Sequence, residues 1–296
     1  MSRLFAFGLG FSAQALAPRL ASQGWEIAGT AREEPKIAAL AAQDYEATRF
    51  AADRSNADLP DLLKGTTHLL HSIPPGPEGD PVLACYRDEI AKLGTLEWIG
   101  YLSTVGVYGD QQGNWVSEET PPKPNSTRTE ARVVAEQAWL DFGEEIGVPV
   151  HVFRLAGIYG PGRSVFDKLA AGTARRINKD GQVFSRVHVE DIARVLEASI
   201  AKPRGGAIYN VADNEPAAPG DVVAHAAEMM GVAPPPEIDF EDADLPPMAR
   251  SFYQGSRKIG NALIKSELGV KLRYPTFREG LKSLLPESLT TETEPR

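Results

Sequence analysis

Short apolar runs alternate with amphipathic ones along the chain as far as residue 212. Runs rich in branched and aromatic residues predict strands at residues 4–7, 26–31, 46–50, 68–73, 98–103, 150–155 and 207–212. Helical periodicity between them predicts helices at about 12–22, 81–93, 127–146 and 189–201. Strands that are apolar on both faces belong in a sheet that helices cover on both sides. The pattern therefore predicts an α/β fold built on a doubly wound parallel sheet.

The composition of the chain changes after residue 212. Proline-rich segments such as EPAAPGD, GVAPPPE and DLPPMA surround shorter helical runs there. We expect a first domain of residues 1–160, to which 187–212 return, and a smaller C-terminal α/β domain of residues 213–286, which 161–186 join. Residues 287–296 are polar and flanked by proline, and this composition predicts a flexible tail.

A glycine-rich turn, Gly8-x-Gly10-x-x-Ala13, joins the first predicted strand to the first helix. This arrangement is typical of Rossmann-like dinucleotide-binding folds. Gly8 permits a tight turn, Gly10 lets the backbone approach a diphosphate, and Ala13 lets helix and strand pack closely. The diphosphate rests on the N–H groups that open the helix, at Phe11, Ser12 and Ala13. The alternative is a tight turn that binds no ligand.

The end of the second strand distinguishes NAD from NADP. A carboxylate there accepts a hydrogen bond from the NAD ribose, whereas an arginine accommodates the NADP phosphate. Arg32 follows Ala31 directly at this point. We therefore expect NADP as the cofactor, with NAD as the alternative; Arg32 otherwise pairs with Glu33 or Glu34 in solvent. Asp53, after the third strand, is placed either to contact the adenine or to cap a helix.

Composition narrows the class of protein. The chain has 296 residues and a formal net charge of −9, which argues against a general binder of nucleic acid or membrane surfaces. Its single cysteine, Cys85, excludes an internal disulfide and fits a reducing compartment. We find neither a signal peptide nor an apolar stretch long enough for a bilayer, so we expect a cytoplasmic protein. The histidines do not form a metal-binding pattern with carboxylates.

Four later runs carry a more specific likeness. They are YLSTVGVYGD (101–110), SEETPPKPNS (117–126), FRLAGIYGPG (153–162) and RVHVEDIARV (186–195). In this order they resemble the extended short-chain dehydrogenase/reductase family, in its epimerase/dehydratase branch. That family uses NAD(P) on sugar nucleotides and other small molecules. The resemblance covers about residues 3–212, and it implies a small-molecule substrate.

The resemblance assigns roles to several side chains. Thr104 corresponds to the family's catalytic serine or threonine. Ser72 and Ile73 line the nicotinamide side of the cofactor site. Tyr159 lies beside the nicotinamide end, either in contact with it or as packing. His188 lies at the rim between the domains; it titrates near neutrality, and we expect either a structural role or contact with the substrate.

The helix at 127–146 departs from the family. Thr127-x-x-Glu130 has capping-box spacing, which predicts the start of this helix. In the family this helix carries a Tyr-x-x-x-Lys dyad, and alignment on Glu136 places Arg128 at the tyrosine and Arg132 at the lysine. The resemblance is therefore to atypical members without the dyad. Either both arginines face an anion, or they lie on a solvated face with Arg132 paired to Glu136.

The glycine loop departs from the family as well. Phe7 and Ala13 stand where the family has its first and third glycines. With the dyad replaced, Thr104 and Tyr108 are the remaining candidates for proton chemistry, since arginine does not exchange its proton near neutral pH. Tyr253 and Arg257 are candidate substrate contacts in the second domain.

Two functions follow from these residues. One is an NAD(P)-dependent oxidoreductase or epimerase that acts on a small anionic or nucleotide-sugar-like substrate with a non-standard catalytic set, including Arg128 and Arg132. The other is a non-catalytic NADP(H)-binding sensor or scaffold. By analogy with the family, a homodimer would form through residues 81–93 and 127–146.

Overall fold

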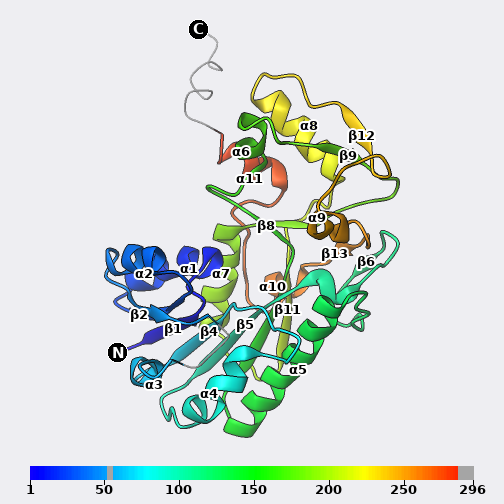
Figure 1. Cartoon of the computed structure of the whole chain (residues 1–296). Helices are drawn as coiled ribbons and strands as arrows, with labels where there is room; N and C mark the ends of the chain where they lie inside the picture. Colours follow the sequence, from blue (N-terminus) through cyan, green and yellow to red (C-terminus); the bar gives the residue numbers. More distant parts are fainter. Residues whose placement is uncertain (52–55, 286–296) are drawn as a thin grey trace.

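A seven-stranded parallel sheet forms the centre of the computed structural model, which describes residues 1–51 and 56–285 (Figure 1). Its strands are β1 (Arg3–Phe7), β2 (Glu26–Ala31), β3 (Glu46–Arg49), β4 (His68–His71), β5 (Trp98–Thr104), β7 (Val150–Leu155) and β11 (Ala207–Val211). They lie in the order β11-β7-β5-β4-β1-β2-β3, and every neighbouring pair is parallel. The predicted Rossmann-like α/β fold is confirmed, since each of these strands was expected from an apolar run.

Alternation along each strand supplies two apolar faces. In β1, Leu4 and Ala6 belong to one core and Phe5 and Phe7 to the other, and all four are buried. The first core is covered by α1 (Phe11–Ala21), α2 (Glu34–Ala41) and α7 (Val189–Ile200). The second is covered by α3 (Leu59–Leu63), α4 (Pro81–Ala91) and α5 (Thr127–Ile146). Strands buried on both faces explain why they read as nearly continuous apolar runs.

The helix α5 begins at Thr127 and ends at Ile146, as the sequence predicted, but its N-cap differs from the expected one. Ser126 is the N-cap: its Oγ accepts from the Thr129 N–H at 3.3 Å, and the Thr129 Oγ1 accepts from the Ser126 N–H at 3.2 Å. The predicted box at Thr127 and Glu130 is wrong by one residue, because the extended backbone of Ser126 (φ −156°, ψ 152°) already leaves Thr127 inside the helix.

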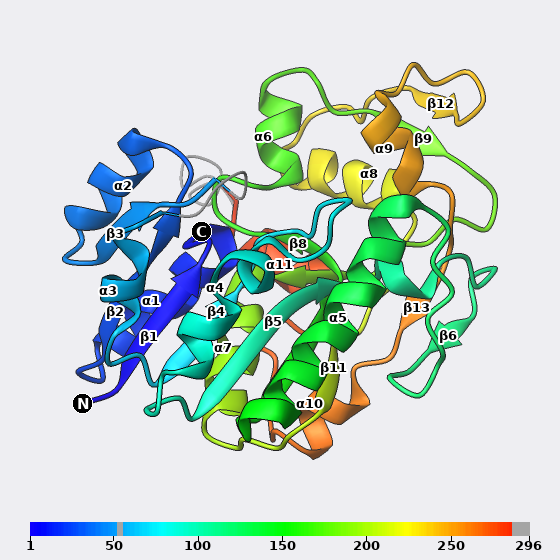
Figure 2. The ribbon, with the colours of Figure 1, turned by 60° about the horizontal axis from the view of Figure 1, so that its bottom comes forward.

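Smaller elements gather beyond the carboxyl end of the sheet, where both views place α6, α8, α9, β9 and β12 together (Figures 1 and 2). They are α6 (Val165–Ala170), β9 (Arg176–Asn178), α8 (Pro219–Met229), β12 (Glu237–Asp239) and α9 (Pro247–Phe252). Together with α11 (Phe277–Lys282) they enclose two small apolar cores of their own.

Three short strand pairs lie outside the central sheet, and one of them, β9 with β12, lies within this group. β8 (Gly157–Tyr159) pairs with β10 (Arg186–His188), β9 with β12, and β6 (Trp115–Val116) with β13 (Lys258–Ile259). α10 (Ala262–Ser266) packs on β11, and Ile264, Leu268 and Val270 join the larger core. This part of the range expected for the second domain therefore returns to the sheet. No helix among the described residues is long and apolar enough to cross a bilayer.

Candidate functional site

The turn after β1 has room only for glycine at its first position. Gly8 adopts a φ of +82°, and its N–H donates to the Thr30 Oγ1 at 2.9 Å. A Cβ at Gly8 would lie 2.6 Å from the Ser72 Oγ and 3.1 Å from the Ile73 side chain. The Ser72 hydroxyl donates to the Gly8 carbonyl at 2.6 Å. The structure thus brings the loop after β4 against the glycine turn.

The start of α1 presents its first backbone N–H donors. Gly10 is its N-cap; no side chain of the described residues caps this end, and the first turn contains no acidic residue. A Cβ at Gly10 would meet only the Gly8 carbonyl, at 3.8 Å, so open space lies in front of the turn. Phe11, Ser12 and Ala13 open the helix, and Ala13 is buried against the sheet. An uncapped, positive helix end behind an open glycine fits a diphosphate.

The end of β2 leaves Arg32 exposed beside a second arginine. The Arg49 Nε donates to the Arg32 carbonyl at 3.2 Å. Within the described part of the chain, no ion pair joins Arg32 to Glu33 or Glu34 within 4 Å, so the alternative of a solvent-exposed pair has no support. Asp53 lies outside the described residues.

The two predicted hydroxyls near the end of β5, those of Thr104 and Tyr108, lie in different surroundings. The Thr104 Oγ1 accepts from the Gly106 N–H at 3.1 Å, which leaves its hydrogen to donate, and the side chain is partly exposed. Tyr108 is fully buried: its hydroxyl donates to the Asn210 Oδ1 at 2.8 Å and accepts from the Arg154 Nη1 at 3.0 Å. Burial raises the pKa of Tyr108. Thr104 is therefore partly accessible at the end of β5, and the geometry of Tyr108 argues against a proton-transfer role.

The two arginines of α5 have different partners. The Arg132 Nη1 donates to the Leu102 carbonyl at 2.9 Å and to the Tyr101 hydroxyl at 3.2 Å, so the side chain lies along the end of β5. Arg128 instead reaches α9, where its guanidinium lies 5.4 Å from the Phe252 ring centre. The alternative in which Arg132 pairs with Glu136 is wrong, because Glu136 is buried and bound elsewhere.

Comparisons with known proteins agree with this arrangement. A sequence model of the NAD dependent epimerase/dehydratase family matches residues 88–212. Protein YeeZ of Escherichia coli K12 is 30% identical over 288 residues, which are 93% of this chain and 97% of YeeZ. The chain belongs to the NAD-dependent epimerase/dehydratase family. The resemblance drawn from the four sequence runs is thereby confirmed.

Solved structures of the family share the whole fold. A functionally unknown conserved protein from Silicibacter pomeroyi is 49% identical, with a TM-score of 0.86 over 96% of this chain and 98% of that one. The dTDP-glucose 4,6-dehydratase of Bacillus anthracis, in complex with NAD, is 19% identical, with a TM-score of 0.77 over 99% of this chain and 97% of that one. At this lower identity the likeness shows the fold alone.

Two aromatic residues expected at the family's site lie in a packed junction instead. Tyr159 and His188 face each other with ring centres 5.2 Å apart, and the Tyr159 hydroxyl lies so near Gly280 that a Cβ there would be 1.8 Å away. The His188 Nδ1 accepts from the Glu190 N–H at 3.2 Å and caps α7. Burial lowers the pKa of His188 to about 4, so the expectation that it titrates near neutrality is wrong.

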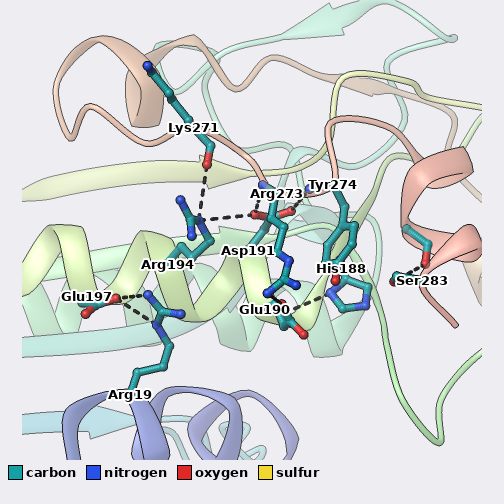
Figure 3. A network of polar contacts seen from close by, with 11 residues as sticks. Arg19, His188, Glu190, Asp191, Arg194, Glu197, Lys271, Arg273, Tyr274 and Ser283 are labelled. Carbon is teal, nitrogen blue, oxygen red and sulfur yellow. Dashed lines mark hydrogen bonds and ion pairs between the residues drawn. The ribbon is translucent and has the colours of Figure 1, made fainter. Parts of the chain in front are cut away.

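An acidic residue of α7 holds the C-terminal segment over this junction (Figure 3). The Asp191 carboxylate accepts from the backbone N–H groups of Arg273 at 2.6 Å and Tyr274 at 2.9 Å. The Tyr274 ring then lies 4.2 Å from the His188 ring, and Glu190 pairs with Arg273 at 2.9 Å. These contacts give His188 a structural position rather than an open one.

Tyr253 and Arg257, the two residues expected to contact the substrate from the second domain, also contact other parts of the protein. Tyr253 packs between Phe184 and Phe240, with ring centres 5.3 and 5.1 Å away. The Arg257 Nη1 donates to the Gly109 carbonyl at 2.5 Å, and burial lowers the pKa of Arg257. The structure therefore brings together the glycine turn, the 72–73 loop, Thr104 and Arg132 at one end of the sheet, but not Tyr108, His188 or Tyr253.

Sequence reasoning missed a buried ionic network under α5. Arg154 and Glu136 are buried and form an ion pair of 2.8 Å, and the Ser103 hydroxyl donates to Glu136 at 2.5 Å. Arg154 also donates to the Tyr108 hydroxyl. One signal was available: an arginine in the otherwise apolar strand VHVFRL requires a buried partner.

Among the described residues, the surface hollows and the search for metal-binding clusters give no stronger candidate site than the glycine turn. Two surface hollows, of about 610 and 510 Å³, lie beside the C-terminal half of α5 and beside residues 269–275, away from the glycine turn. No group of three or more His, Cys, Asp or Glu side chains is placed to hold a metal ion in residues 1–51 and 56–285.

The burial of Asp213, two residues after the end of β11, predicts that stability depends on pH. Asp213 is 1% exposed, its Oδ2 has no partner among the described residues, and burial raises its pKa to about 7. The folded protein therefore keeps a proton that the unfolded chain releases above about pH 4. The free energy of unfolding should fall as pH rises from 4 to 7, by on the order of 3–4 kcal/mol from this group.

The measurement is urea unfolding of the native protein and of Asp213→Asn between pH 4 and 8. The amide keeps the shape but does not ionise, so the variant should be the more stable protein above pH 7. Arg186, Glu215 and Asp191 also face this carboxylate and are unchanged in both proteins. Parallel pH profiles for the two proteins would contradict the assignment.

Proposed function

We propose that this chain is an NADP(H)-dependent oxidoreductase or epimerase that acts on a small anionic or nucleotide-sugar-like substrate. The observation that carries the proposal is the uncapped start of α1 behind Gly8 and Gly10, at the same end of the sheet as Thr104 and Arg132. Structural relatives support the substrate class: MoeE5 has been solved with UDP-glucose and NAD and with UDP-glucuronic acid and NAD.

The proposed roles follow from the contacts of each side chain. A bound nicotinamide supplies hydride transfer. The N–H groups of Phe11, Ser12 and Ala13 hold the diphosphate, and the donors of Arg132 that Leu102 and Tyr101 do not engage hold a ribose hydroxyl or phosphate. Thr104 donates to a carbonyl or hydroxyl of the substrate. The catalytic set is non-standard because an arginine stands at each position of the dyad.

The alternative is a non-catalytic NADP(H)-binding sensor or scaffold. One observation favours it: the hydroxyls of Tyr108 and Tyr159 are both buried, and burial raises the pKa of each, so neither is an obvious replacement for the family's tyrosine. Thr104 alone is a weak acid. A homodimer through α4 and α5 stays a prediction.

Turnover separates the two functions. The protein is mixed with NADPH or NADP and a panel of sugar nucleotides, and the absorbance of the reduced cofactor is followed, with product analysis for epimerisation. A change that depends on protein and substrate supports the enzyme. Tight cofactor binding with neither redox change nor isomerised product across the panel would favour the sensor.

The preference for NADP rests on Arg32. Arg32→Ala should weaken NADPH binding roughly tenfold, the loss of one charge-assisted contact at an exposed site, while NADH binding changes little. Fluorescence titration of both reduced cofactors measures this, and NADH, which lacks the 2′-phosphate, is the internal control. An equal change for the two cofactors would count against a phosphate contact at Arg32.

A further inference from the structure

Four of the segments that run between the central sheet and the group of α6, α8 and α11 meet at one junction. They are residues 157–160, 184–188, 212–218 and 272–277. β8 pairs with β10, the Asp213 N–H donates to the Arg186 carbonyl at 2.7 Å, and the Asn214 N–H donates to the Pro275 carbonyl at 2.8 Å. A movement of that group relative to the sheet would therefore act on this junction.

The junction contains buried polar groups that have no hydrogen-bond partner within residues 1–51 and 56–285. They are the Tyr159 hydroxyl, the His188 Nε2 and the Asp213 Oδ2. The side chains of His188 and Asp213 are each 1% exposed. A buried polar group without a partner costs roughly 1–3 kcal/mol. Three such groups in one place make the packing of the junction sensitive to their hydrogen bonding and charge.

The carboxyl of Asp213 faces a cation that is bound elsewhere. Its Oδ1 accepts from the Glu215 N–H at 3.1 Å, and Arg186 is the cation whose charge acts on it. The Arg186 Nη1 donates to the carbonyls of Phe184 at 2.9 Å and Ala217 at 3.2 Å. Phe184 and Ala217 also exchange backbone hydrogen bonds of 3.0 and 3.1 Å, just before α8. Arg186 therefore fastens the entry to α8 and leaves the Asp213 Oδ2 without a partner.

We propose that the proton on Asp213 is a latch for this junction. With the proton bound, the carboxyl is neutral and the four segments stay packed. A buried carboxylate instead needs a cation or water. If Arg186 turns to the carboxylate, it gives up its bonds to Phe184 and Ala217, and water enters when residues 212–218 separate from residues 184–188. Loss of the proton would thus loosen the entry to α8.

Charged and titratable side chains act on the latch from each element packed on it. They are Tyr159 in β8, Arg186 in β10, Asp191 in α7, Glu215 and Asp221 at the entry to α8, and Glu279 in α11. Burial raises the pKa of Asp213 to about 7. Because the closed junction binds the proton more tightly than a solvated carboxyl does, opening becomes easier as pH rises from 4 to 7. The latch operates in the protein alone and does not depend on the proposed function.

The test is hydrogen exchange of the native full chain at pH 6 and pH 8, measured by NMR and corrected for the intrinsic change in exchange rate. The amides of Phe184 and Ala217 report on the junction, and that of Phe5, in β1 near the centre of the sheet, reports on global unfolding. The junction amides should be less protected than Phe5 at both pH values. Their protection should fall roughly tenfold from pH 6 to pH 8, as expected for a carboxyl whose pKa rises from about 4 to about 7 on closure.

Two variants separate the latch from other carboxylates. Asp213→Asn cannot ionise, so the protection of its junction amides should be the same at pH 6 and pH 8. Glu215→Gln is the matched control: it removes a neighbouring carboxylate that pairs with Arg278 at 3.0 Å, and it should keep the native pH dependence. Protection of the native junction amides that does not change with pH, or that equals the protection of Phe5 at both pH values, would overturn the latch. The same fall in Asp213→Asn as in the native protein would overturn it as well.

Discussion

Replacing Gly10 with alanine is expected to remove most of the cofactor affinity and to leave the fold intact. The backbone of Gly10 (φ −94°, ψ −158°) suits alanine, and the added methyl would meet only the Gly8 carbonyl, at 3.8 Å. That methyl would instead occupy the space in which the diphosphate approaches the backbone. We expect NADPH and NADH affinities to fall by about 10²-fold, from lost contacts to the charged group.

Gly8→Ala is the matched contrast. Its φ of +82° and the 2.6 Å approach to the Ser72 Oγ predict strain in the fold itself, roughly 1–3 kcal/mol in the free energy of unfolding. Urea unfolding and cofactor titration of both variants separate the two effects. If Gly10→Ala binds both cofactors as the native protein does, the diphosphate does not lie at this turn.

The second large effect is expected from the ion pair of Glu136 and Arg154. Both side chains are about 3% exposed, and Glu136 accepts both from Arg154 and from the Ser103 hydroxyl. Arg154→Met would leave the Glu136 carboxylate buried without its cation. The cost of such a broken pair is about 3–5 kcal/mol in the free energy of unfolding.

Three variants measured by urea unfolding test this expectation. The double variant Glu136→Leu with Arg154→Met replaces both charges by apolar groups and should lose much less stability than Arg154→Met alone. Arg19→Met, which breaks the half-exposed pair of Arg19 with Glu197, is the control and should cost within about 1 kcal/mol. Similar costs for Arg154→Met and Arg19→Met would contradict the importance of the buried pair.

The buried pair bears on function through the position of α5. Glu136 lies one helical turn after Arg132, and Arg154 is in β7, the neighbour of β5. The pair therefore fixes the register of α5 against the strands whose ends carry Thr104 and contact Arg132.

The sequence by itself determined the sheet, the longer covering helices α1, α4, α5 and α7, and the glycine turn. Strands such as 150–155 are apolar on both faces, and this composition is stable only inside a covered sheet. The sequence Gly8-x-Gly10 was also sufficient to predict the turn, because the positive φ of Gly8 is a local property of that residue. Local signals thus predicted these elements and the glycine turn after β1.

Only the tertiary structure decided which polar side chains face the site. Arg128 and Arg132 lie one turn apart, yet one reaches α9 and the other the end of β5. Tyr108 and His188 were both candidate site residues from their motifs, but their partners, Asn210 and Tyr274, come from distant parts of the chain. The burial and the partner of a polar group depend on packing between segments far apart in sequence, and no local pattern encodes that packing.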